Sequence, residues 1–296
     1  MYLSIIIMNN RIERIIREEI NKVVNEGIDI DKYNLSVSYN PSHKDNVETS
    51  EVTNPTMVTK YAPNVEVWSI FKRKVGSTND GNPLVYAMKG ERGWKFKTTR
   101  DMNAIYGQIE KIANKFFQNY QSDVTVVVPS QGVLNEVIGN LAKKHNSAAL
   151  FIDNLFLKLT CEEVLEIILL PNSMFRRVFR NAEDFENAYN TLENLYMPKM
   201  GKYYRSHFVK DESIRTAVDQ TIRIVEERVG NYMDAINNKN ILVLDDNVGY
   251  GSTIGQICKL LRQYYSPATI TALTFFSEKY DKNGRQIQSI RKRHRR

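Results

Sequence analysis

The pattern of apolar and polar positions predicts three amphipathic helices that lie far apart in the chain. Isoleucines and valines recur at helical spacing in residues 10–25, and Gly27 follows as a stop signal. Residues 101–119 repeat this pattern with isoleucines and phenylalanines on one face. In residues 211–236 the apolar positions lie three or four apart throughout, which is typical of one long helix. We expect its apolar face to belong to the protein core.

Four short runs consist almost entirely of apolar or β-branched residues. They are residues 123–129, 148–153, 241–244 and 269–276. Such runs are typical of strands that are buried on both faces of a parallel sheet. Helical patterns lie between and around them, at residues 133–145, 161–170, 181–196 and 254–262. The order of these elements predicts an α/β fold with a mainly parallel sheet that is flanked by helices.

The part of the chain before this sheet predicts a smaller α+β region. Residues 65–73 alternate as a strand does, residues 76–81 have the composition of a turn, and residues 83–89 read as the returning strand. Residues 93–97 suggest a third strand. We expect a small antiparallel unit here, serving as a hood or an accessory subdomain.

These patterns divide the chain into an N-terminal accessory region (1–120), a main α/β domain (121–280) and a basic tail (281–296). The formal net charge is +7, and the last six residues carry five fixed positive charges. Such a cluster can make a weak contact with nucleic acid or another polyanion, but it is also typical of a solvated chain end. We favour the second interpretation, because no aromatic residues are interleaved with the charges for base stacking.

Composition also limits the compartment and the chemistry. The longest apolar runs are too short to span a bilayer, and the first eight residues lack the positive flank and the cleavage site of a signal peptide. We therefore expect a cytoplasmic protein without membrane contact. The only cysteines, Cys161 and Cys258, fit two buried thiols rather than a disulfide framework. The four histidines show no metal-ligand spacing with them.

The most informative chemistry follows the apolar run at residues 241–244. Two adjacent carboxylates, Asp245 and Asp246, come directly after it, at the strand end where open α/β sheets bind ligands. A loop of small residues then leads into a predicted helix, and both the loop backbone and the first N–H groups of that helix can approach an anion. Hydroxyls on the aspartates and a phosphate on the loop would suit this polarity, so the stretch fits a sugar phosphate.

This stretch resembles the ribose-phosphate signature of the type I phosphoribosyltransferases. The resemblance implies that Asp245 and Asp246 are the catalytic pair and bind the ribose hydroxyls of phosphoribosyl pyrophosphate. The loop that matches the cradle of the 5′-phosphate consists of Gly249, Tyr250, Gly251, Ser252 and Thr253. Two positions depart from the family pattern. Asn247 stands where an aliphatic residue is usual, and Tyr250 stands where a small Thr or Ser is usual.

The resemblance also implies where the pyrophosphate would bind. The loop after the strand at residues 123–129 matches the family's pyrophosphate loop and consists of Ser130, Gln131 and Gly132. The family often has a basic residue in this loop, and here that residue is replaced by Gln131. Residues 198–210 match the mobile loop that closes over the reaction centre, and its candidates for the pyrophosphate are Lys202, Arg205 and Lys210. An ordinary solvated loop explains these charges equally well.

The implied function is transfer of a phosphoribosyl group to an unidentified acceptor, with release of pyrophosphate. Mg²⁺ would be held by pyrophosphate and ribose oxygens rather than by a protein cage. Enzymes of this family are commonly dimers, so a homodimer is one expectation. Two alternatives stay open. A non-catalytic sensor of a nucleotide or sugar phosphate is slightly favoured by Gln131 and Tyr250, and a nucleic-acid-associated protein of a bacterial defence module is supported only by the basic tail.

Overall fold

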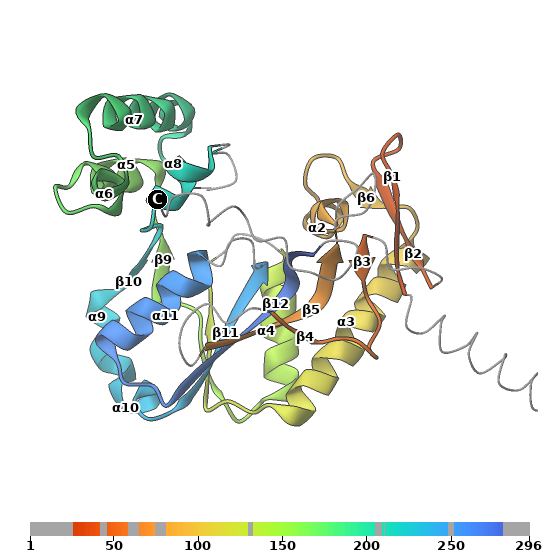
Figure 1. Ribbon diagram of the computed structural model, residues 1–296. Helices are drawn as coiled ribbons and strands as arrows, with labels where there is room; N and C mark the ends of the chain where they lie inside the picture. The colour runs from red at the N-terminus through yellow and green to blue at the C-terminus, as the bar shows by residue number, and fades with distance from the viewer. Residues whose placement is uncertain are drawn as a thin grey trace, which may run out of the picture.

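The computed structural model describes residues 26–41, 46–58, 65–74, 81–129, 133–204, 209, 211–247 and 252–280. The expected helix at residues 10–25, most of the expected turn at 76–81 and the basic tail lie outside these residues. The described chain forms a central sheet with helices on both faces and a separate group of helices at one end of it (Figure 1).

The central sheet has seven strands, most of them parallel. Its parallel strands lie in the order β5 (Val65–Lys74), β12 (Thr269–Tyr280), β11 (Asn240–Asn247), β7 (Val124–Val127) and β8 (Leu150–Ile152). Two short strands, β3 (Val47–Glu48) and β4 (Thr56–Val58), pair with β5 in antiparallel fashion. The expectation of an α/β fold with a mainly parallel sheet is thereby confirmed, and a phosphoribosyltransferase-like fold stays a prediction.

The central strand β11 is buried on both faces, as its uninterrupted apolar run predicts. Leu242 and Leu244 pack into one hydrophobic core, which also holds side chains of α3 (Thr99–Asn119) and α4 (Val133–His145). Ile241 and Val243 pack into a second core on the opposite face, which holds side chains of α11 (Ser252–Tyr264). Because successive side chains of a strand point to opposite faces, a sheet that is covered on both sides needs apolar residues at every position.

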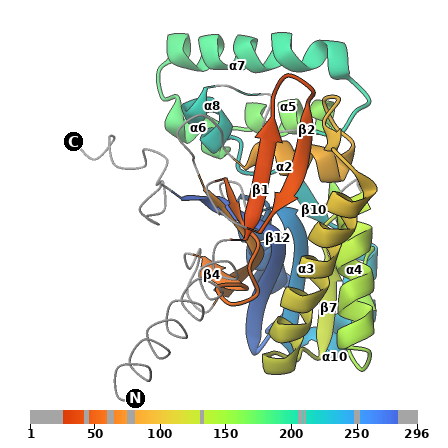
Figure 2. The ribbon, with the colours of Figure 1, turned by 90° about the vertical axis from the view of Figure 1, so that its right-hand side faces the viewer.

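A third hydrophobic core lies within residues 159–218, which we call the helical cap. Its elements are α5 (Cys161–Leu169), α6 (Met174–Val178), α7 (Ala182–Tyr196), the 3₁₀ turn η1 (Met197–Lys199) and α8 (Glu212–Ala217). The expected helices at 161–170 and 181–196 are therefore confirmed. An antiparallel ribbon of β9 (Phe156–Lys158) and β10 (Ile222–Ile224) connects the cap to the rest of the chain. Both views show the cap at the end of the sheet where the parallel strands terminate (Figures 1 and 2).

The prediction of one long helix over residues 211–236 is wrong. The segment contains α8, β10, α9 (Glu226–Val229), the 3₁₀ turn η3 (Gly230–Tyr232) and α10 (Met233–Ile236). Its apolar residues serve different cores, because Ile214 and Val218 pack in the cap whereas Ile222 and Ile224 pack against the sheet. Pairing of β10 with β9 therefore outweighs the helical periodicity, and the β-branched side chains of β10 suit a strand.

The predicted hairpin of residues 65–73 and 83–89 is also wrong. The first strand exists as β5, but it pairs with β12 inside the central sheet. Residues 83–89 belong to a helix, α2 (Asn82–Lys89), with Pro83 in its first turn and Gly90 after its end at φ 64°. Both are helix-end signals, since proline lacks an N–H that the first turn does not need and glycine adopts left-handed backbone without strain.

The remaining N-terminal strands form a second, three-stranded sheet. It consists of β1 (Gly27–Asp31), β2 (Ser36–Asn40) and β6 (Lys95–Phe96), of which β6 is the expected third strand. Strand β6 pairs in parallel with β2, whereas the prediction placed it in an antiparallel unit with residues 65–73 and 83–89. The central sheet thus takes β3, β4 and β5 from the region before residue 120. Among the described residues, no helix is long and apolar enough to cross a bilayer.

Candidate functional site

Asp245 and Asp246, which we call the acid pair, lie at the carboxyl end of β11, in the middle of the central sheet. Asp245 is only 5% exposed, and it pairs with Thr274 of the neighbouring strand β12. The backbone N–H of Asp246 donates a hydrogen bond of 2.8 Å to Asp245 Oδ1. Val128 N–H donates to the carbonyl of Leu244, so the backbone that extends β7 lines the other side of the pair. Both sides of this strand end are therefore enclosed by neighbouring backbone.

This enclosure has a direct electrostatic consequence for Asp245. Burial, followed by the negative charge of Asp246, raises the pKa of the Asp245 carboxyl to about 8. The N–H of Asp246 and the lysines Lys158 and Lys89 oppose the rise in pKa without cancelling it. Near neutral pH, Asp245 therefore holds its proton for most of the time. A strongly shifted carboxyl at a strand end is typical of a functional site.

Asp246 forms an ion pair with a residue that sequence analysis did not connect with the site. Its Oδ2 lies 2.5 Å from Lys89 Nζ, and the two side chains are 13% and 20% exposed. Lys89 is the last residue of α2, where a cation also interacts favourably with the negative end of the helix dipole. The ion pair is largely shielded from water, so its charges are screened less than those of a surface pair.

Lys89 reaches the acid pair because α2 is fixed at its other end. Arg73 of β5 is buried, and its guanidinium donates hydrogen bonds to Asn82 Oδ1 at 3.0 Å and to the carbonyl of Ser277 at 2.7 Å. Just before the helix, a side chain at Gly81 would place its Cβ 2.7 Å from Val47 Cγ2, so only glycine fits there. Buried apolar residues of α2 then complete its packing. Helix α2 lies at the same end of the sheet as the helical cap (Figure 2).

A second lysine, from a part of the chain that follows α2, interacts electrostatically with Asp245. Lys158 ends β9, and its charge lowers the pKa of Asp245. Phe156, at the start of the same strand, is buried in the core that also contains Val243 of β11. Packing of β9 against the sheet thus sets the position of Lys158. Neither lysine was singled out by its sequence pattern, because their proximity to Asp245 and Asp246 depends on the tertiary fold.

The predicted 5′-phosphate loop lies mainly outside the described residues. Gly249, Tyr250 and Gly251 belong to the part that is not described, whereas Ser252 and Thr253 begin α11. The helix thus starts where the motif predicts an anion-binding N-terminus, and phosphate binding there stays a prediction. Just before the loop, Asn247 Oδ1 is buried without a hydrogen-bond partner among the described residues. A buried oxygen at this position can accept a hydrogen bond that an aliphatic residue could not.

The predicted pyrophosphate residues are only partly described. Ser130, Gln131 and Gly132 lie outside the described residues, between β7 and α4, and so do Arg205 and Lys210. Lys202 is exposed in the helical cap, where its N–H donates to the carbonyl of Lys199 and its carbonyl accepts from Cys161. Their part in binding pyrophosphate therefore stays a prediction. The predicted burial of both thiols is confirmed, since Cys161 and Cys258 are buried and free.

The acid pair fits a divalent cation only together with oxygens from a ligand. The described residues contain no group of three or more His, Cys, Asp or Glu side chains that could hold a metal ion. Asp246 nevertheless presents a partly exposed carboxylate. Mg²⁺ commonly takes one or two carboxylate oxygens and fills its other positions with water or phosphate oxygens. The donor set is therefore suited to Mg²⁺ that arrives with a phosphorylated ligand.

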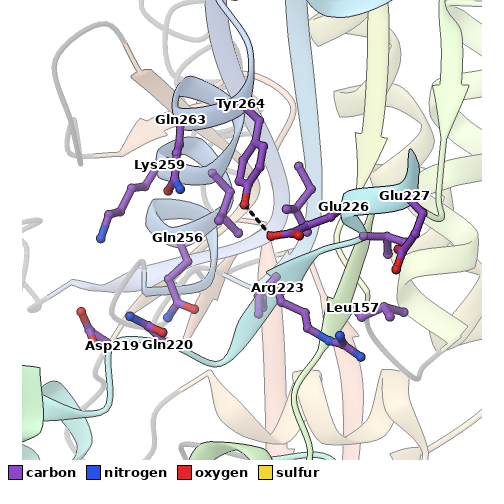
Figure 3. A pocket seen from close by; sticks show the side chains of 14 residues that line it. Leu157, Asp219, Gln220, Arg223, Glu226, Glu227, Gln256, Lys259, Gln263 and Tyr264 are labelled. Atoms are coloured by element: carbon purple, nitrogen blue, oxygen red, sulfur yellow. Dashed lines mark hydrogen bonds between the residues drawn. The ribbon is translucent and has the colours of Figure 1, made fainter. Parts of the chain in front are cut away.

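A separate polar cavity of about 620 Å³ lies between β10 and α11 (Figure 3). Its lining carries both signs of charge and includes Arg223, Lys259 and Glu226. The hydroxyl of Tyr264 donates a hydrogen bond of 3.0 Å to Glu226 Oε1 across one wall. Neither member of the acid pair lines this cavity. We therefore place the candidate site at the acid pair, where burial and charge converge.

Comparison with known proteins assigns no function to the chain. No protein-family model, no curated protein and no solved structure matches it. The function is therefore inferred from the residues of the site and from the resemblance of residues 241–253 to the ribose-phosphate signature.

Proposed function

We propose that this protein binds phosphoribosyl pyrophosphate with Mg²⁺ and transfers the phosphoribosyl group to an acceptor. The observation that carries the proposal is the acid pair itself. Asp245 and Asp246 lie at the carboxyl end of the central strand, and the next helix, α11, begins shortly after them at Ser252. A carboxylate pair beside a helix N-terminus offers acceptors to hydroxyl groups and N–H donors to a phosphate.

In the proposed reaction, the acid pair acts on the ribose ring. Asp246 accepts hydrogen bonds from ring hydroxyls, and ionised Asp245 adds negative charge next to the carbon that becomes positive. The bond between the anomeric carbon and the pyrophosphate oxygen breaks, and its electron pair goes to the pyrophosphate. The acceptor forms the new bond to that carbon and loses its proton to solvent. Bound Mg²⁺ would supply positive charge to the pyrophosphate oxygens, with Asp246 as its protein ligand.

A non-catalytic sensor of a nucleotide or sugar phosphate is the second candidate. Gln131 supports it, because this residue stands where the resembling family often has a cation. The ion pair of Asp246 with Lys89 supports it as well, since a ligand that reaches Asp246 must exchange this partner. Both candidates bind their ligand at the same residues, and the sensor differs from the enzyme in that it releases no pyrophosphate. A homodimer, and a weak contact of the basic tail with polyanions, stay predictions for both.

Calorimetric titration with phosphoribosyl pyrophosphate and Mg²⁺ tests the proposal. The wild-type protein should bind, and the variant Asp245→Asn/Asp246→Asn should lose at least about tenfold in affinity, because charge-assisted hydrogen bonds to the ribose are removed. Asp234→Asn is a matched control, since it removes one carboxylate from an exposed position in α10. This control should bind as the wild type does.

Release of pyrophosphate in the presence of candidate acceptors then separates the two functions. Turnover with a base or another nucleophile supports the transferase, and binding without release supports the sensor. No binding of phosphoribosyl pyrophosphate by a folded wild-type protein would refute the transferase, and nucleotides, other sugar phosphates and nucleic acid would be the next ligands to test. Equal binding by the double variant would refute the site at Asp245 and Asp246.

A further inference from the structure

The acid pair poses an electrostatic problem for a ligand that carries a pyrophosphate. Such a ligand brings several negative charges toward Asp246, and at close range like charges repel strongly in a shielded site. The loop at residues 130–132, which matches the family's pyrophosphate loop, contains Ser130, Gln131 and Gly132 and therefore no cation. Positive charge for the pyrophosphate must come from another part of the chain or from a metal ion.

The structure brings one lysine into direct contact with the pair and a second within electrostatic reach. Lys89 Nζ lies 2.5 Å from Asp246 Oδ2, and four-fifths of its side chain is shielded from water, since it is 20% exposed. Lys158 lies at the end of β9 and acts on Asp245. The two lysines come from separate elements, α2 and β9. They are thus presented by the two parts of the protein that flank the carboxyl end of the sheet.

The ion pair with Asp246 explains why a shielded lysine is tolerated before ligand binding. Removing an ammonium group from water is costly unless an opposite charge or hydrogen-bond acceptors replace the water. When ring hydroxyls or a metal ion occupy Asp246, Lys89 loses part of this partner and needs another anion. A phosphate oxygen beside Asp246 provides one, and the long, flexible lysine side chain can reach it without movement of the helix.

We propose that Lys89, with Lys158 as a second cation, holds the pyrophosphate of the bound sugar and so supplies the positive charge that the 130–132 loop lacks. This inference rests on the proposed function and adds the residues that distinguish a pyrophosphorylated sugar from a simple sugar phosphate. As the anomeric C–O bond breaks, its electron pair adds negative charge to the pyrophosphate, and Lys89 lies where it can offset that charge. Lys89 is therefore the residue that determines specificity for the pyrophosphate end.

The test compares two ligands that differ only in the pyrophosphate. The full-length wild type, Lys89→Met, Lys158→Met and the double variant are titrated with phosphoribosyl pyrophosphate and with ribose 5-phosphate, each with Mg²⁺. Lys89→Met should bind phosphoribosyl pyrophosphate roughly tenfold or more weakly, since one charge-assisted contact is lost. Its affinity for ribose 5-phosphate should be unchanged or higher, because Asp246 no longer has to exchange an ion-pair partner. The variant that combines Lys89→Met and Lys158→Met should lose more affinity for phosphoribosyl pyrophosphate than either single variant.

Two further variants separate this role from a structural one. Lys144→Met removes an exposed lysine of α4 that pairs with Glu110, so it should leave both affinities unchanged. Lys89→Arg keeps the charge and should recover most of the preference for the pyrophosphorylated ligand. Binding of ribose 5-phosphate shows that each variant is folded at the site.

The outcomes distinguish failure of this inference from failure of the proposed function. If the wild type binds phosphoribosyl pyrophosphate and Lys89→Met keeps the same ratio of affinities for the two ligands, the inference is wrong and the proposed function stands. An equal loss for both ligands also overturns it, because Lys89 would then act only by orienting Asp246. If the wild type binds neither ligand, the proposed function fails, and the inference fails with it.

Discussion

Replacement of Asp245 by asparagine should stabilise the folded protein, and the gain should grow with pH. The folded carboxyl has a pKa of about 8 instead of the usual 3.8, because it is buried and lies next to Asp246. Between these two values the unfolded chain has released this proton and the folded protein still holds it. A group whose pKa is raised in the folded state stabilises fully below the unfolded pKa, and this contribution is lost as the pH rises through the folded pKa.

The size of the effect follows from the proton difference between the two states. One proton that is bound only in the folded state lowers stability by about 1.4 kcal/mol for each pH unit. Between pH 5 and pH 8 this amounts to roughly 3–4 kcal/mol, since the slope becomes smaller near the folded pKa. Asparagine has nearly the same shape, keeps an oxygen for the N–H of Asp246 and does not ionise. We therefore expect Asp245→Asn to be more stable than the wild type by an amount that increases by about 3 kcal/mol over this range.

Urea unfolding at pH 5, 6, 7 and 8, followed by the fluorescence of Trp68 and Trp94, measures this difference. Val243→Ala is a matched control, since it alters the same strand at a fully buried apolar position. It should cost about 1–3 kcal/mol at every pH, because no titrating group is changed. The difference in the free energy of unfolding between the wild type and Asp245→Asn could instead stay constant from pH 5 to pH 8. That result would show that the buried carboxyl does not have a raised pKa, and it would refute our description of the site.

Three further predictions concern ligand binding, packing and thiol reactivity. In the proposed mechanism, phosphoribosyl pyrophosphate binds to ionised Asp245. Its binding should therefore release a proton and strengthen from pH 6 to pH 8, because the Asp245 carboxyl has a pKa of about 8. Titration enthalpies that are identical in buffers of different ionisation enthalpy would contradict this. Gly81→Ala should destabilise the protein by about 1–3 kcal/mol, because its Cβ would lie 2.7 Å from Val47 Cγ2. The control Gly107→Ala on α3 should stabilise by about 0.5–1 kcal/mol, since no atom lies within 4 Å of its new Cβ; thermal unfolding that ranks the two variants otherwise would refute the packing argument. Cys161 and Cys258 should react with a thiol reagent only after unfolding, because burial raises the pKa of both thiols, and rapid reaction of the native protein would argue against their burial.

Local chemistry was sufficient to predict the elements that carry the acid pair. The runs at residues 241–244 and 269–276 became β11 and β12, since strands covered on both faces have few alternatives to apolar side chains. The helix after the motif was expected at residues 254–262 and extends over Ser252–Tyr264. The carboxylates at the end of β11 were also visible in the sequence, because they follow the last apolar residue of the strand.

Elsewhere, tertiary pairing decided between local alternatives that the sequence left nearly equal. Residues 83–89 fit a strand by hydrophobicity, yet Pro83 and Gly90 mark the two ends of a helix that packs with five buried side chains. Residues 211–236 fit one helix by periodicity, but β10 pairs with β9, and the apolar residues on the two sides of this segment pack into two different cores. In both places the winning structure depends on contacts that lie far away in the chain.

The sequence by itself determined a parallel sheet, an acid pair at the end of a central strand and a helix that begins beyond it. Only the tertiary structure decided the electrostatics of that pair. Lys89 reaches Asp246 because Arg73 and the close approach at Gly81 fix α2, and Asp245 holds a proton because neighbouring strands remove it from water. Patterns of hydrophobicity record which side chains are buried, whereas charge interactions depend on distances across the fold, and these are set by the packing of segments that are remote in sequence.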